Sequence, residues 1–155
     1  MIRILLTLFT ILSLTGCSDN PPPKLAPELE GTLVSSAAPV AMENLQGQQI
    51  YLYFFPMGCE ECWVTIEKMD KLRDQLNLIG IVMYEEIDNY WYDVYELSRR
   101  HFINLLPLYA DHDENIAYDY NVEQFPAWIT VNKSGDISKS ASTPPSEVLE
   151  HMEKL

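Results

Sequence analysis

Six consecutive residues, Ile50–Phe55, form an unbroken run of β-branched, aliphatic and aromatic side chains. A run without polar alternation is typical of a strand that is covered on both faces, as the strands of parallel sheets are. Pro56-Met57-Gly58 ends the run, and from Cys59 to about Leu76 apolar side chains recur at mostly helical spacing. A buried strand followed directly by a helix predicts an α/β protein.

The rest of the chain continues this alternation. Lys133-Ser134-Gly135-Asp136 predicts a hairpin turn, which adds an antiparallel edge to the sheet. With 155 residues the chain is long enough for one ordinary domain, expected over residues 39–155. The fold class is therefore α/β, with a central mixed sheet flanked by helices. Further strands are expected near 29–34, 78–84, 106–110, 127–132 and 137–140, and helices near 88–101 (with Asp88 as N-cap), 114–120 and 144–155.

The N-terminus has the pattern of an export signal. One positive charge at Arg3 precedes an apolar run, Ile4–Leu14, that is too short to span a bilayer. Leu14-Thr15-Gly16-Cys17 resembles the lipobox of bacterial lipoproteins, which implies cleavage after residue 16 and acylation of Cys17. An ordinary secretory signal is the alternative. Residues 17–38, rich in proline, are expected to be a flexible tether.

Charge and cysteine count narrow the function further. The net charge of −13 argues against nucleic-acid binding, because phosphates are bound by clustered Lys and Arg. Three cysteines in an exported protein leave one thiol over. If Cys17 carries lipid, Cys59 and Cys62 remain as a pair. The expected location is the bacterial cell envelope, on the periplasmic face; Ser18 after the anchor resembles lipoproteins sorted to the outer membrane.

Cys59-Glu60-Glu61-Cys62 lies where the buried strand gives way to the helix. The unpartnered N–H groups and the positive dipole end of a helix start stabilise a thiolate at the first position. The thiolate is the reactive form of cysteine, and its pKa falls in such motifs. The spacing allows the second sulfur to resolve a mixed disulfide on the first. We therefore expect Cys59 to attack and Cys62 to resolve.

Residues 29–155 resemble the thioredoxin superfamily, and most closely its membrane-tethered TlpA/ResA-type thiol–disulfide oxidoreductases. The resemblance implies a thioredoxin-like fold, no organic cofactor, client proteins with disulfides or thiols, and a membrane redox partner. It also implies that Pro126 is a cis-proline beside the dithiol and that the Phe125 backbone pairs with the client. Trp63 and Phe125 are expected to rim a client groove, with core packing as the alternative for Trp63. The resemblance rests on Leu45-Gln46-Gly47, Phe54-Phe55, Cys59-x-x-Cys62, Leu106-Pro107-Leu108-Tyr109-Ala110-Asp111, Tyr120-Asn121-Val122 and Phe125-Pro126-Ala127-Trp128.

The chain departs from that branch at three positions, where Gly58, Glu61 and Thr65 replace the usual Trp, Pro and Glu. The acid that usually helps to move protons is thus missing, with Glu60, Glu61 or Glu67 as possible substitutes. A carboxylate at ~8 Å disfavours a thiolate by about 0.5–2 kcal/mol, depending on the effective dielectric. The acidic pair therefore predicts a reductant or mild exchanger rather than a strong oxidant. The alternative is that Glu60 and Glu61 only favour helix initiation.

The residues near the motif argue against two other activities. Pro56, Glu60 and Trp63 fall near a peroxiredoxin pattern but lack its Thr or Ser and its Cys. Metal binding by the two cysteines with His101 or His112 is disfavoured, because structural zinc usually needs four ligands at characteristic spacings. His101 is expected at a helix C-terminus, and His112 in a surface turn with Asp111 and Asp113. The remaining alternative to an oxidoreductase is a non-catalytic binding module whose cysteine pair is structural or holds copper or zinc.

Overall fold

The computed structural model describes residues 25–84, 90–112, 114–140 and 142–155. The predicted signal peptide, Cys17 and the predicted N-cap Asp88 lie outside these residues. None of the helices within them is long and apolar enough to cross a membrane.

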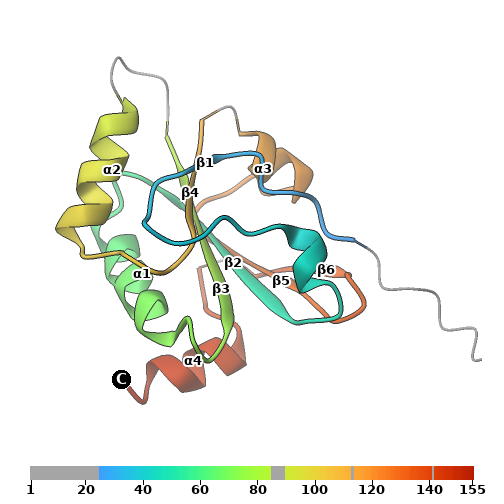
Figure 1. Cartoon of the computed structure of the whole chain (residues 1–155). Coiled ribbons are helices and arrows are strands. Elements are labelled where there is room, and N and C mark those ends of the chain that lie inside the picture. The colour runs from blue at the N-terminus through green and yellow to red at the C-terminus, as the bar shows by residue number, and fades with distance from the viewer. Residues whose placement is uncertain (1–24, 85–89, 113, 141) are drawn as a thin grey trace, which may run out of the picture.

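A six-stranded mixed sheet forms the centre of the molecule, in the order β1-β4-β3-β2-β5-β6 (Figure 1). The inner strands β2, β3 and β4 are parallel, whereas β1, β5 and β6 each pair antiparallel to a neighbour. The predicted mixed sheet flanked by helices is confirmed. The strands are β1 (Thr32–Leu33), β2 (Ile50–Pro56), β3 (Asn77–Met83), β4 (Leu108–Asp111), β5 (Ala127–Val131) and β6 (Ile137–Ser140).

The helices cover both faces of the sheet, which explains why β2 is apolar throughout. Tyr51, Tyr53 and Phe55 point into a core shared with α1, α2 and α4, which we call the α1 face. The alternate residues of β2 point into a second core shared with α3 and η1, the α3 face. The helices are η1 (a 3₁₀ turn, Met42–Leu45), α1 (Glu60–Leu72), α2 (Tyr90–Arg100), α3 (Asn115–Asp119) and α4 (Ser146–Met152).

Several boundaries differ from those expected. The helix that contains the cysteine motif ends at Leu72 instead of Leu76. Just after this end, the Gln75 N–H donates to the Leu72 carbonyl at 2.9 Å. The last helix is shorter at both ends, since Pro145 is its N-cap. The 3₁₀ turn was not predicted.

The N-terminal segment lies on the sheet earlier than expected. Ala26, Leu29 and Val34 are buried, and β1 pairs with β4 at the sheet edge. Part of the stretch predicted as a flexible tether, residues 17–38, therefore packs with the folded unit, because its few apolar side chains cover core that would otherwise be exposed.

Candidate active site

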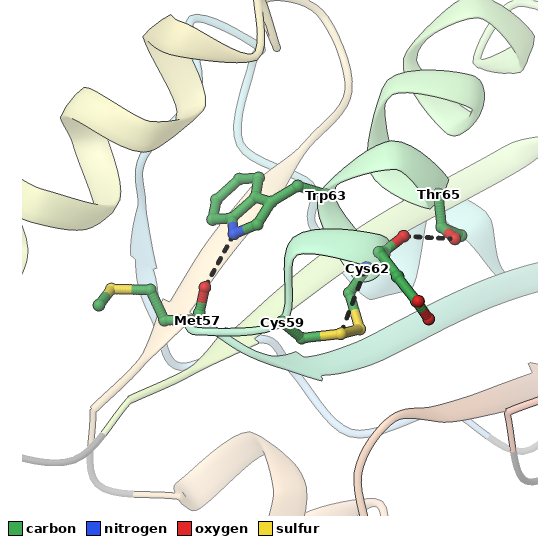
Figure 2. Close-up of a disulfide and its surroundings, with 6 residues drawn as sticks. Met57, Cys59, Cys62, Trp63 and Thr65 are labelled. Carbon is green, nitrogen blue, oxygen red and sulfur yellow. Dashed lines mark hydrogen bonds between the residues drawn. A yellow bond between two sulfur atoms is a disulfide. The ribbon is translucent and has the colours of Figure 1, made fainter.

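The two cysteines lie where β2 passes into α1. After β2 ends at Pro56, Met57 N–H donates to the Met83 carbonyl of β3 and Cys59 N–H donates to the Pro56 carbonyl, both at 3.0 Å. Cys59 is the N-cap of α1, with extended backbone, and its sulfur accepts the Cys62 N–H at 3.2 Å (Figure 2). The sequence thus places Cys59 at the positive end of the helix, where a thiolate is stabilised.

Cys59 and Cys62 form a disulfide, with 5.2 Å between their Cα atoms. Their burial differs, because Cys62 is only 2% exposed whereas Cys59 is partly exposed. Of the two residues, Cys59 is therefore the one that an incoming thiol or disulfide can meet. This asymmetry is what an attacking and a resolving thiol require.

Trp63, predicted to rim a client groove, is instead a core residue. It is 1% exposed, and its indole N–H donates to the Met57 carbonyl at 2.8 Å (Figure 2). The Trp63 ring contacts the Phe55 ring edge-on, with 5.1 Å between the ring centroids. The His101 ring stacks on the Trp63 ring, also with 5.1 Å between centroids and with 12° between the planes. These contacts correct the groove assignment and favour the packing alternative, since a side chain enclosed in this way offers no surface to a peptide.

Phe125 and Pro126 precede β5 and are joined by a cis peptide bond, as predicted. Ala127 pairs with Phe54 of β2, so Pro126 lies at the end of the sheet from which the chain runs on to Cys59. Both residues are half-buried, and the Phe125 ring packs against the α3-face core. Phe125 keeps part of its surface exposed, and its place in a client groove stays a prediction.

The position at which the resembling branch carries a glutamate holds a hydroxyl group here. The Thr65 hydroxyl donates to the Glu61 carbonyl at 3.4 Å (Figure 2). Thr65 also hydrogen-bonds the Tyr53 side chain, which partly offsets the rise in the pKa of Tyr53 that burial causes. This part of the α1 face therefore carries neutral groups at pH 7.

The three glutamates considered as substitutes lie elsewhere. Glu60 and Glu61 are exposed in the first turn of α1. Glu67 contacts His101, with 2.8 Å between its carboxylate oxygen and Nδ1. His101 directly follows α2, where a C-terminal position was expected.

Metal ligands do not gather in the described part of the chain, where no three His, Cys, Asp or Glu side chains form a candidate cluster. His112 is exposed and meets the Tyr84 ring at 5.2 Å. Asp111, however, does not belong to a surface turn. It is 1% exposed at the end of β4, and its carboxylate accepts the N–H groups of Ile116 at 3.3 Å and Ala117 at 2.9 Å.

Asp111 thus caps α3 although it lies outside the helix, at the end of β4. Glu114, the residue at the N-cap position, makes no side-chain cap hydrogen bond. Burial raises the pKa of Asp111, while the backbone hydrogen bonds oppose that rise.

Sequence reasoning also missed the contacts around Trp63. The four-residue spacing of Trp63 and Glu67 is a local signal for a shared helix face, but no local pattern in the sequence indicates His101.

A mixed sheet flanked by helices, with a Cys-x-x-Cys disulfide at the start of α1 and a cis-proline before β5, defines a thioredoxin-like fold. No family model and no curated protein sequence matches the chain. Solved structures do. A thiol:disulfide interchange protein of the thioredoxin family from Chlorobium tepidum matches with a TM-score of 0.64 at 18% identity, over 87% of this chain and 97% of that one.

Two further matches are described as a secreted protein and an exposed lipoprotein. A secreted disulfide oxidoreductase of Mycobacterium tuberculosis, homologous to E. coli DsbE, matches at 19% identity with a TM-score of 0.56, over 81% of this chain and 94% of that one. The exposed lipoprotein thioredoxin of Streptococcus pneumoniae matches at 16% identity with a TM-score of 0.57, over 73% and 89%. At these identities the likeness establishes the fold.

Proposed function

We propose that this protein is a thiol–disulfide oxidoreductase that exchanges disulfides with client proteins outside the cytoplasm. The observation that carries the proposal is the Cys59–Cys62 disulfide at the N-terminus of α1, with Cys59 accessible and Cys62 buried. The solved structures with this fold include described oxidoreductases, which supports the same activity.

In the reducing direction, the Cys59 thiolate attacks one sulfur of a client disulfide and a client thiolate leaves. A mixed disulfide then joins Cys59 to the client. Cys62 loses its proton and attacks the Cys59 sulfur, which releases the second client thiolate. Two electrons have moved to the client, and the Cys59–Cys62 disulfide remains. A membrane redox partner restores the dithiol, and no organic cofactor takes part.

Pro126 and the Phe125 backbone, at the same end of the sheet, are the proposed docking site for the client chain. The acidic pair Glu60 and Glu61 favours the reducing direction, because negative charge beside Cys59 disfavours its thiolate and so makes the disulfide a weaker oxidant. A reduction potential of about −120 mV, at the strong-oxidant end of the range, would contradict this assignment.

The proposed location is the cell envelope, with an acyl chain on Cys17 holding the domain at the membrane. Secreted and lipid-anchored proteins among the structural matches are compatible with it. Radiolabelled palmitate should label the wild-type protein and not Cys17→Ser; equal labelling of the two would remove the anchor from the proposal.

The experiment that tests the activity is trapping. Cys62→Ser should accumulate mixed disulfides with clients through Cys59, and the double variant with Cys59→Ser should accumulate none. Insulin reduction with a supplied reductant should show turnover for the wild type only. An untrapped, inactive protein in which Cys59 is still alkylated would instead identify a non-catalytic scaffold.

A further inference from the structure

The carbonyl of Met57, two residues before Cys59, is held by a set of side chains that we call the Trp63 clamp. The clamp consists of Trp63, its ring neighbours Phe55 and His101, and Glu67. Phe55 comes from β2, Trp63 and Glu67 from α1, and His101 from the segment after α2. Three elements therefore meet around one indole ring.

The clamp fixes the segment that presents Cys59. Met57 is bound on both sides, because its N–H donates to Met83 of β3 at 3.0 Å and its carbonyl accepts the Trp63 indole N–H at 2.8 Å. Trp63 in turn directly follows Cys62. The backbone on the N-terminal side of one cysteine is thus tied to the residue on the C-terminal side of the other (Figure 2).

His101 closes the clamp, and Glu67 orients His101. A carboxylate accepts hydrogen bonds only, so the 2.8 Å contact places a proton on Nδ1 of His101. The imidazole is then held nearly parallel to the indole, at 12° and 5.1 Å. Because the His101 side chain is 12% exposed, it also separates Trp63 from solvent on that side.

We propose that His101 is a positioning residue for the dithiol. By holding Trp63, and through it the Met57 carbonyl, His101 keeps Cys59 in the N-cap geometry in which its sulfur accepts the Cys62 N–H at 3.2 Å. A hydrogen bond to a charged acceptor is stronger than one to a neutral acceptor, so this geometry favours the thiolate. The inference rests on the proposed function in taking Cys59 as the attacking thiol.

Removal of the imidazole should therefore lower the reactivity of Cys59. A hydrogen bond or aromatic pair of this kind is worth a factor of about three to ten. In the reduced full-length protein at pH 7, we expect His101→Ala to slow iodoacetamide alkylation of Cys59 by that factor. Alkylation is followed by mass spectrometry after cleavage at glutamate, because cleavage after Glu60 or Glu61 separates Cys59 from Cys62.

The equilibrium with glutathione provides a second readout. Because the thiolate form of the reduced protein is less stabilised, the dithiol–disulfide equilibrium of His101→Ala should shift toward the disulfide by a similar factor. His101→Phe retains a ring on Trp63 but loses the hydrogen bond with Glu67, so it should slow alkylation by about two- to threefold, less than His101→Ala. His151→Ala, which removes a histidine near the end of α4, is the matched control and should change neither quantity.

Glu67→Ala provides a second test if His101→Ala does not fold. Because the Glu67 side chain is 40% exposed, its removal should leave the protein folded. It should slow alkylation by about two- to threefold. Unchanged alkylation and equilibrium in His101→Ala and Glu67→Ala, or an equal change in His151→Ala, would overturn the positioning role. These readouts need no client. If the wild type does not reduce insulin but His101→Ala still slows alkylation, only the proposed function is refuted. If the wild type reduces insulin and His101→Ala changes neither alkylation nor the equilibrium, only this inference is refuted.

Discussion

The two faces of the sheet are built from the same strands but with different chemistry. On the α1 face, β2 contributes Tyr51, Tyr53 and Phe55, and β5 contributes Trp128. On the α3 face, the alternate residues of the same strands are mostly aliphatic: Ile50, Leu52, Phe54, Ala127, Ile129 and Val131. The face that supports the cysteine pair is thus rich in aromatic rings with polar tips.

The hydrogen bonds of those tips connect different parts of the molecule. On the α1 face, Tyr51 donates to Glu147 of α4 and Trp63 donates to Met57 beside the dithiol. On the α3 face, Tyr120 donates to the Pro27 carbonyl at 2.7 Å, and the Tyr109 hydroxyl accepts Val40 N–H at 2.7 Å. The hydrogen bonds of the α1 face therefore tie α4 to β2 and α1 to the segment before Cys59, and those of the α3 face fasten the N-terminal segment onto the sheet.

Trp128 shows how dense the aromatic packing of the α1 face is. Its ring lies 4.6 Å from that of Tyr53, and it is fully buried. Its indole N–H is the only buried side-chain polar atom without a partner within the described residues. Leaving such a donor unpaired costs free energy. The packing of the rings at this position has to offset that cost.

The largest contrast between the faces should appear in activity. Cys59→Ser removes the accessible sulfur and should reduce insulin reduction to below about one thousandth of the wild-type rate, since no other nucleophile replaces it. Its midpoint of urea unfolding in the presence of reductant should match that of the reduced wild type. Residual turnover above a few per cent would show that Cys62 can attack clients directly.

Large-to-small substitutions should separate stability from reactivity. Trp63→Ala and Leu52→Ala, on the α1 and α3 faces respectively, should each lower the free energy of unfolding, by about 3–5 and 2–5 kcal/mol. At a temperature where both variants are folded, only Trp63→Ala should also slow Cys59 alkylation, because only Trp63 contacts the Met57 carbonyl. Equal alkylation rates in the two variants would erase the distinction between the faces.

Two glycines provide a finer comparison of space. A Cβ at Gly31 would lie 2.9 Å from the Ala110 carbonyl, which is backbone, besides 2.8 Å from the end of Ile116, whereas the nearest atoms at Gly80 are the side-chain ends of Leu108 and Ile66, at 2.7 and 2.8 Å. Side-chain ends can rotate away and backbone cannot. Gly31→Ala should therefore destabilise more than Gly80→Ala, by about 2–3 against 1–2 kcal/mol in chemical denaturation. The reverse order would mean that the sheet edge at β1 yields more easily than the α1 face.

The smallest effect is expected at alkaline pH. Burial, followed by the hydrogen bond to Glu147, raises the pKa of Tyr51 from 10.0 to about 12. Between these values the unfolded chain loses the phenolic proton while the folded protein keeps it, so stability present below pH 10 is lost as the pH rises toward 12. The slope is about 1 kcal/mol per pH unit. Tyr51→Phe should unfold with a shallower pH dependence over this range, measured as the urea midpoint; an identical slope would place the titration elsewhere.

Local patterns in the sequence were sufficient for much of the fold. The unbroken apolar run at Ile50–Phe55 predicts a strand buried on both faces, and the two cores confirm it. The Cys-x-x-Cys motif at a strand–helix junction predicts the Cys59–Cys62 pair, because helix starts are recognisable from neighbouring residues. The cis bond at Pro126 followed from the resemblance of its flanking residues, and the structure confirms it.

Only the tertiary structure decided how those elements serve one another. Glu67 and His101 are 34 residues apart and meet because α1 and the end of α2 pack on the same face. Asp111 became a buried cap, and Trp63 a core residue, for the same reason. Residue type and spacing report what a segment prefers by itself, whereas burial and partner choice depend on which distant segment covers it. The chemistry of the two sulfurs is encoded locally; the support that positions them comes from packing.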